Sequence, residues 1–171
     1  MELKLDRCTV RSFRADDAAS IAEHANNRGV WINVRDRFPH PYTLKDAEAY
    51  LGRVMATRPE TSFAIDVGGA AIGAIGIEPG EGEYHGSAEI GYWLGEAYWG
   101  RGIATEVLRA MTEYAFSTFG FHRLEAIAFE WNAASARVIE KAGYQFEGRL
   151  RKSILKAGKP VDELVYAIVR E

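Results

Sequence analysis

This chain of 171 residues has only one cysteine and a small net charge, and each of these features excludes a class of protein. Cys8 is the single cysteine, so an intramolecular disulfide and a cysteine-rich metal site are excluded. One cysteine is consistent with a reducing, cytoplasmic setting. With a net charge of −3, the chain does not have the large excess of basic residues that generic nucleic-acid or membrane-surface binders carry. We therefore expect partners that are neither nucleic acid nor membrane.

Long apolar runs and metal-binding histidine patterns are also missing. No uninterrupted apolar stretch approaches the length that spans a bilayer, and the charged segment MELKLDR at the start has no apolar run behind it. We expect neither a membrane helix nor a signal peptide. His24, His40, His85 and His122 show no H-x-x-x-H spacing, so no metal site is expected.

The remaining composition is that of a globular protein with 47% apolar and 26% charged residues. Repeats, low-complexity tracts and linkers rich in Ser, Pro or Gly are not found, so we expect one domain over residues 1–171.

Hydrophobic periodicity predicts an α/β domain with a central, mixed and mostly antiparallel sheet. The expected order is β-α-α-β-β-β-α-β-α-β-β. Gly68-Gly69 predicts a two-residue hairpin, Thr43 predicts a helix cap, and Asp16-Asp17 predicts another. The expected elements are a first strand over 3–5 and 8–13 with a turn or bulge, a helix over 18–26, irregular chain over 29–42, a helix after 43, strands over 62–67, 70–77 and 88–94, a helix over 100–118, a strand over 123–129, a helix over 133–141, and strands over 144–155 and 161–169.

The stretch over 89–106 has the most chemical content. A predicted strand ends at Leu94, and Gly100-Arg101-Gly102 opens a predicted helix. Glycines let backbone approach a ligand closely, and the N–H groups of a first helical turn attract anions. The loop therefore predicts an anion-binding site suited to a pyrophosphate, with Arg101 adding charge. The alternative is a plain helix start. A third glycine and a Gly-Lys-Ser/Thr ending are both missing, which excludes a dinucleotide fingerprint and a nucleotide-binding P-loop.

Two motifs carry a family resemblance. EIGYWL over 89–94 followed by YWGRGIATE over 98–106 resembles the acetyl-CoA signature of the GNAT superfamily. NAAS over 132–135 with EKAGY over 140–144 is similar to its second motif. The chain is most similar to the RimJ/RimL-type ribosomal-protein N-terminal acetyltransferases, and the similarity covers nearly all of it. Trp99 departs from the pattern, because the superfamily commonly has Gln or Arg there.

The resemblance implies a GNAT fold, with splayed strands flanked by helices, and acetyl-CoA as the acetyl donor. In that family the pantetheine arm lies between two strands, which here match 92–94 and the strand that ends at Phe129. Asn132 is implied as a ligand of that arm, and its alternative is a plain helix cap. The implied cofactor-binding residues are Tyr92, Trp93, Leu94, Trp99, Gly100, Arg101, Gly102, Ile103, Ala104, Thr105, Asn132 and Ser135.

The resemblance also implies catalytic roles. Glu89 matches the position of a catalytic glutamate in some superfamily members, so it is the expected base; its alternative is a surface glutamate. Ser135 is the expected proton donor to the leaving thiolate, or else a first-turn serine. A backbone N–H near Trp93 or Leu94 could stabilise the oxyanion. Some bacterial members use a tyrosine seven residues after the asparagine as the general acid. That position is Ile139 here, so the role does not carry over to this chain.

The acceptor is expected to be a primary amine. Trp31, Asn33, Arg35 and Tyr42 lie where the family builds its acceptor wall, and the alternative is an ordinary loop packed by aromatic residues. We expect a protein or peptide N-terminal α-amine as acceptor, in a monomer or a homodimer. A small amine (a polyamine, an amino acid or an antibiotic) is the alternative acceptor. A non-catalytic CoA-binding module is the alternative outside enzymes.

Overall fold

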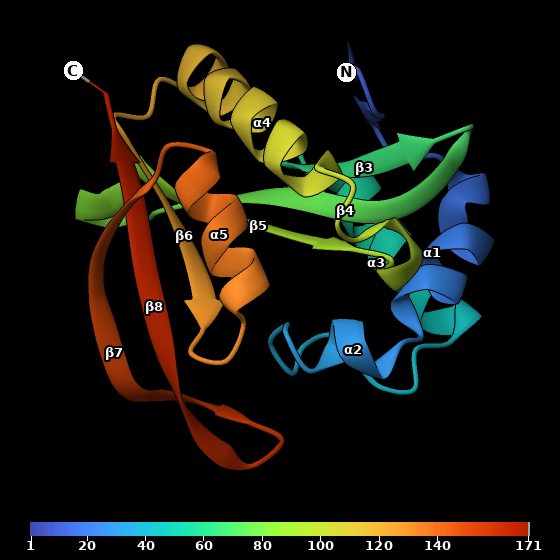
Figure 1. The fold of residues 1–171 in the computed structure, drawn as a ribbon. Coiled ribbons are helices and arrows are strands. Elements are labelled where there is room, and N and C mark those ends of the chain that lie inside the picture. The colour runs from blue at the N-terminus through green and yellow to red at the C-terminus, as the bar shows by residue number, and fades with distance from the viewer. Residues whose placement is uncertain (171) are drawn as a thin grey trace. The chain divides into compact units, whose positions relative to one another are not determined.

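The computed structural model describes residues 1–170 (Figure 1). These residues form two compact units. The first unit consists of Met1–Gly76 with Tyr92–Val107, and the second of Ile77–Gly91 with the chain from Leu108 onward. No helix within residues 1–170 is long and apolar enough to cross a membrane. One domain over residues 1–171 stays a prediction.

The strands are β1 (Glu2–Lys4), β2 (Thr9–Arg11), β3 (Ser62–Val67), β4 (Ala70–Pro79), β5 (Ser87–Leu94), β6 (Arg123–Phe129), β7 (Gln145–Lys156) and β8 (Lys159–Val169). The helices are α1 (Ala18–Ala25), α2 (Arg28–Trp31), α3 (Leu44–Ala56), α4 (Ile103–Phe119) and α5 (Ala133–Lys141). Short 3₁₀ turns are η1 (Ala15–Asp17), η2 (Gly82–Tyr84) and η3 (Glu96–Tyr98).

The strands follow one another in the hydrogen-bonding order β1-β2-β3-β4-β5-β6-β8-β7. The pairs β1–β2, β2–β3, β3–β4, β6–β8 and β7–β8 are antiparallel, and the pair β5–β6 is parallel. The predicted mixed and mostly antiparallel sheet is therefore confirmed.

In the first unit, α1 and α3 pack on the strands through small residues. Ala64, Ala71 and Ala74 of β3 and β4 join the apolar faces of both helices in one buried cluster. Thr43 begins α3 as predicted: its hydroxyl accepts from the Asp46 amide at 3.2 Å, and the Asp46 carboxylate accepts from the Thr43 amide at 2.8 Å.

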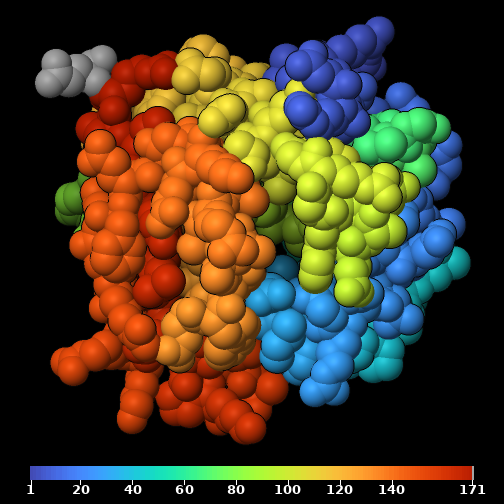
Figure 2. Space-filling model, in the orientation of Figure 1, coloured from blue at the N-terminus to red at the C-terminus, as the bar shows by residue number. Residues whose placement is uncertain are grey.

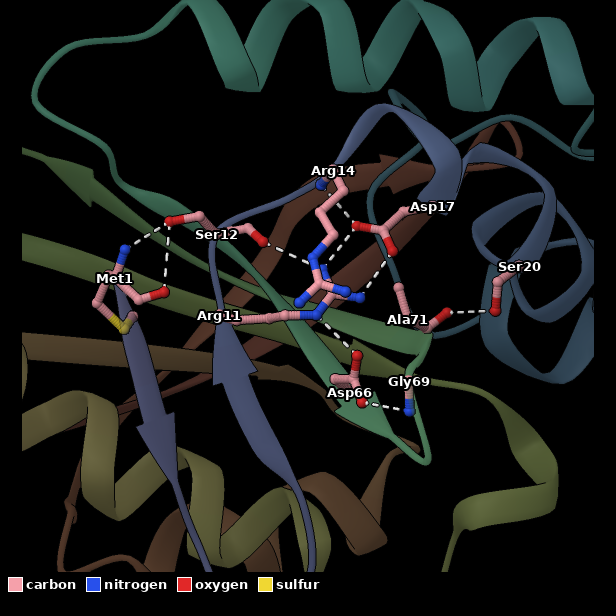
Figure 3. A network of polar contacts seen from close by, with 9 residues as sticks. All are labelled: Met1, Arg11, Ser12, Arg14, Asp17, Ser20, Asp66, Gly69 and Ala71. Carbon is pink, nitrogen blue, oxygen red and sulfur yellow. Dashed lines mark hydrogen bonds and ion pairs between the residues drawn. The ribbon is translucent and has the colours of Figure 1, made fainter.

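A buried ion network ties β2, η1 and β3 together (Figure 3). The Arg11 guanidinium donates to both Asp17 carboxylate oxygens at 2.7 and 2.8 Å, and to Asp66 at 2.7 Å. All three side chains are buried. Burial raises the cost of charging Asp17, but hydrogen bonds from Arg11 and the Arg14 amide outweigh it and lower the pKa of that carboxyl.

In the second unit, α5 packs on β6 and β8. The side chain of Thr112 on α4 hydrogen-bonds the Tyr144 hydroxyl at 2.8 Å, and burial raises the pKa of Tyr144 to about 12. The Arg109 guanidinium donates to the Lys141 carbonyl at the end of α5. These contacts fix the position of α5 and therefore of its N-terminal cap.

The sequence-based elements need three corrections. Residues 3–13 form two paired strands instead of one, because a tight turn closed by the Leu5 amide and the Cys8 carbonyl reverses the chain. Asp17 occupies the N-cap position of α1 as predicted, but its side chain makes no capping bond to α1, because Arg11 and the Arg14 amide engage its carboxylate. The segment 29–42, predicted irregular, contains most of the short helix α2, which Asn27 caps.

Candidate functional site

The glycine loop between β5 and α4 has the geometry of an anion-binding site. Gly100 and Gly102 have φ angles of +72° and +80°, which L side chains rarely adopt. Residues of alternating handedness turn successive N–H groups to one side. The first helical bond runs from the Glu106 amide to the Gly102 carbonyl at 3.1 Å, so the amides of 103–105 have no acceptor within the helix. The predicted helix start at Gly100 shifts to Ile103, and both glycines stay outside it.

Trp99 anchors this loop to the end of β5. Its indole Nε1 donates to the Leu94 carbonyl at 2.7 Å, closing the five-residue path from strand to loop. The ring also approaches the start of α2, since a Cβ added at Gly29 would lie 3.3 Å from Trp99 Cη2. At this position the superfamily commonly has a polar side chain, and here Trp99 instead links the loop to the end of β5 through its indole.

Residues of α1 and of the link between α1 and α2 also contact this loop. The Asn27 side chain donates to the Glu96 carboxylate at 2.6 Å. The His24 ring meets the Tyr98 ring edge to face at 5.5 Å, and Arg101 lies over that same Tyr98 ring at 5.3 Å. Arg101 is exposed and is therefore placed at the glycine loop with its charge in solvent.

The end of β5 is fixed by its own side chains. The Trp93 ring is partly buried: it packs on the α1/α3 cluster and meets the Phe38 ring at 5.4 Å. Leu94 is buried, and Tyr92 is half-buried. The Gly95 amide donates to the Ile72 carbonyl at 2.8 Å, which fixes the start of the loop.

The predicted acceptor-wall residues lie in this same unit. Trp31 stacks on His40 at 5.5 Å, and the Asn33 side chain donates to the Gly29 carbonyl at 2.9 Å. The Arg35 carbonyl accepts from the Phe38 amide at 3.0 Å, closing a turn. Asn33 therefore bonds to Gly29, which the Trp99 ring also approaches, so the structure brings this predicted acceptor residue near the start of the glycine loop.

Tyr42 is placed differently from the other three. It is 6% exposed, packs on Phe38 at 4.8 Å, and belongs to the α1/α3 cluster. Burial, and to a lesser degree the charge of Asp46, raises the pKa of Tyr42 to about 12. Tyr42 therefore packs in the core beneath the segment 29–42. Its contact with an acceptor stays a prediction.

Asn132 and Ser135 come together at the start of α5 in the second unit. The Asn132 side-chain oxygen accepts from the Ser135 amide at 3.1 Å, so Asn132 caps the helix. That bond fixes the orientation of the amide group and leaves its NH₂ end as the donor for a ligand. Ile139 is buried in the core, so it contributes no acid.

Glu89 lies where the pairing between β5 and β6 ends. The parallel register joins Ser87–Arg123, Ala88–Leu124 and Glu89–Glu125. Beyond Glu125, β6 continues to Phe129 in register with β8. The Glu89 side chain is half-buried at this point. An interrupted parallel pair is the pattern that the predicted splayed strands require.

Two charged residues near these elements were not singled out from the sequence. Arg7, in the β1–β2 turn, lies against Gly102: an added Cβ there would be 3.4 Å from Arg7 Nε. Glu163 of β8 is 4% exposed, pairs in register with Phe129, and accepts from the Ser153 hydroxyl at 2.8 Å. No local pattern identifies either, because both contacts join residues distant along the chain or across strands.

Within residues 1–170, no group of three or more His, Cys, Asp and Glu side chains is placed to hold a metal ion.

The comparisons with known proteins agree with this geometry. Residues 7–145 match the family described as acetyltransferase (GNAT) domain. YoaA of Bacillus subtilis (strain 168), an uncharacterised N-acetyltransferase, is 40% identical over 99 residues, 58% of this chain and 55% of YoaA. The L-amino acid N-acetyltransferase AaaT of Escherichia coli (strain K12) is 30% identical over 83 residues, 48% of this chain and 51% of AaaT. The chain thus spans about half the length of these two relatives.

Solved structures match over nearly the whole chain. An acetyltransferase (GNAT family) of Bacillus anthracis is 26% identical, with a TM-score of 0.86 over 99% of this chain and 98% of that one. RimJ of Mycobacterium smegmatis, solved in complex with CoA-disulfide, is 25% identical, with a TM-score of 0.84 over 95% of this chain and 81% of that one. RimL, a ribosomal L7/L12 alpha-N-protein acetyltransferase solved with coenzyme A, is 18% identical with a TM-score of 0.85 over 99% and 98%, and it shares the fold.

The chain therefore belongs to the GNAT family of N-acetyltransferases, enzymes that use acetyl-CoA. The GNAT fold and the family resemblance predicted from the sequence are confirmed, and acetyl-CoA is the donor that this family uses.

Proposed function

We propose that this chain transfers the acetyl group of acetyl-CoA directly to the α-amino group of a peptide or protein N-terminus. The binding of the donor is supported mainly by the glycine loop. Gly100 and Gly102 have positive φ angles, and the amides of 103–105 that follow have no acceptor within their own 17-residue helix. A pyrophosphate suits this loop because its amides, the helix dipole and Arg101 all favour negative charge.

The residues proposed to hold the donor fit that role by their chemistry. The loop and first turn over 99–105 would bind the phosphates, and the backbone over 92–94 and the Asn132 amide would bind the pantetheine arm. When bound, the donor supplies an activated thioester carbonyl. A backbone N–H of Trp93 or Leu94 would stabilise the oxyanion, as donors fixed in a strand do without reorganising.

Proton transfer is assigned to two side chains. Glu89 accepts a proton from the incoming ammonium, because only the neutral amine can attack. Ser135 donates a proton to the departing sulfur, and its place in the Asn132 cap supports that role by fixing its backbone. Cys8 takes no part: it is buried, and burial raises the pKa of its thiol to about 11, so it is a poor nucleophile near neutral pH.

The acceptor half of the proposal rests on the wall and on amine chemistry. An extended N-terminus needs a firm surface, and Asn33 of the wall bonds to Gly29, which the Trp99 ring of the glycine loop also approaches. An α-amine has a pKa of about 8, against about 10.4 for lysine, so less help is needed to deprotonate it. RimL shows that an alpha-N-protein acetyltransferase can have this fold. AaaT, which acts on L-amino acids, supports a small-amine acceptor as the second candidate.

The test is an acceptor screen read by release of free CoA thiol. Peptides that differ in their first residue are compared with free amino acids and a polyamine, using N-acetylated peptides as blanks. The expected result is turnover of peptides with a free N-terminus and none of the blanks. Gly102→Asp, which puts a side chain and a negative charge into the loop, serves as the control that cannot bind donor. Efficient acetylation of small amines with no peptide turnover would overturn the proposed acceptor, and CoA binding without thiol release from any amine would indicate a non-catalytic module.

A further inference from the structure

We propose that Arg7, on the turn between β1 and β2, binds a phosphate group of CoA. This inference rests on the proposed function, because it assumes that the donor's phosphates lie at the glycine loop. It adds a residue that lies outside both sequence motifs and almost 100 positions before the loop.

Glu106 fixes the β1–β2 turn against the start of α4. Its two carboxylate oxygens accept from the Asp6 amide at 2.8 Å and the Arg7 amide at 3.2 Å. The turn is itself closed by the Leu5 amide and the Cys8 carbonyl at 2.9 Å. Figure 2 shows the result as a dark blue N-terminal surface that adjoins the yellow-green surface of the loop and helix start. The turn is therefore docked on the helix by its backbone.

The Arg7 guanidinium lies beside the loop. A Cβ built on Gly102 would be 3.4 Å from Arg7 Nε and 3.8 Å from its Cδ and Cζ, so the Arg7 side chain borders the space that a side chain at Gly102 would occupy. Its ion pair with Glu106 is long, at 3.8 Å, and the Arg7 side chain is 54% exposed. The guanidinium therefore keeps donors for a further anion, and its fork geometry suits a phosphate.

Charge balance around the loop favours the same role. An acid in a first helical turn normally satisfies the helix's own amides and competes with an anionic ligand. Here the Glu106 carboxylate is used by the β1–β2 turn, and the Glu96 carboxylate accepts from Asn27. These bonds hold both carboxylates in place without removing their charge, and Arg7 and Arg101 add positive charge beside the loop.

The experiment measures binding by calorimetry with CoA and with dephospho-CoA, which lacks the ribose 3′-phosphate. Arg7→Gln is compared with Lys4→Gln, which removes one positive charge from the same hairpin at a side chain 82% exposed and paired with Glu2. Arg7→Gln should weaken CoA binding by about 10-fold at low salt, with a smaller effect at high salt, while Lys4→Gln changes little. Arg7→Lys should recover part of the loss, and thermal unfolding should show that all variants are folded.

The two ligands identify the phosphate. A loss with CoA alone assigns Arg7 to the 3′-phosphate, and an equal loss with both ligands assigns it to the pyrophosphate. Unchanged affinity of Arg7→Gln for both ligands, in a protein whose wild type binds CoA, would overturn the inference and leave the proposed function intact. Failure of the wild-type protein to bind either ligand would instead overturn the proposed function.

Discussion

The Trp99 indole donates its N–H to the Leu94 carbonyl at 2.7 Å, and this bond joins the last residue of β5 to the glycine loop. A neutral hydrogen bond contributes about 1 kcal/mol, so its loss should loosen the loop without unfolding the protein. We expect Trp99→Phe, which keeps an aromatic ring but loses the donor and the outer indole ring near Gly29, to raise the KM for acetyl-CoA about 3- to 10-fold with a smaller change in kcat.

Steady-state kinetics and the unfolding midpoint check this prediction together. Tyr84→Phe, at a side chain 72% exposed in η2, is the control for a small aromatic change and should match wild type. An unaltered KM for acetyl-CoA in Trp99→Phe would mean that the loop holds its shape without the bond.

Gly100 and Gly68 offer a matched pair for testing the loop's conformation. Both have positive φ angles, +72° and +65°, and an added Cβ would meet nothing within 4 Å at either. Alanine at either position should cost about 1–2 kcal/mol of stability through backbone strain alone. Only Gly100→Ala should also weaken CoA binding, since its strain falls on the amides proposed to face the phosphates. Equal CoA affinity in the two variants would contradict the placement of the phosphates at this loop.

The sequence predicted most of the architecture because the signals were local. Thr43 with Asp46, Gly68-Gly69, and the helical spacing over 133–141 each need only neighbouring residues, and each prediction is confirmed. The β1–β2 hairpin was missed because its strands are only three residues long, too short to show a period. The position of Asp17 at the start of α1 was predicted, but its bond to Arg11 was not, because Arg11 lies on another element and a buried ion pair leaves no periodic signal.

For the candidate site too, the residues in a local motif were predictable from the sequence, and those placed by contacts between distant residues were not. The glycine loop is a contiguous motif, so its position followed from spacing and resemblance. Tyr42 was assigned to the acceptor wall by position along the chain, and its burial could not be known without the packing of Phe38. Arg7 reaches the loop through Glu106, a contact that only the folded chain makes.

The Arg11–Asp17 pair should give the protein a specific acid sensitivity. Because the pKa of Asp17 is lowered in the folded state, its contribution to stability is complete above its unfolded pKa of about 3.9 and disappears as the pH falls through the folded value. Asp17→Asn should cost about 3 kcal/mol near pH 7, since it leaves a buried guanidinium poorly paired. The difference from wild type should shrink progressively below pH 4.

Urea unfolding from pH 7 to pH 2.5 measures this difference. Glu113→Gln is the comparison, because Glu113 pairs with Arg170 at the surface, where an ion pair contributes little. A pH-independent gap between Asp17→Asn and wild type would show that the loss comes from packing and not from charge.

Glu89 offers the sharpest test of the proposed chemistry, because its register partner Glu125 supplies a matched control one strand away. Glu125 pairs with Arg123 at 3.2 Å and is assigned no role, so Glu125→Gln should keep wild-type kcat. Glu89→Gln should lower kcat by about 100-fold near pH 7, within the range of general base catalysis. The loss should diminish above the amine's pKa of about 8, where the acceptor is already neutral and the base is not needed. A kcat profile for Glu89→Gln that follows wild type at every pH would remove Glu89 from the mechanism and direct the search to the buried carboxylate of Glu163 or to a water chain.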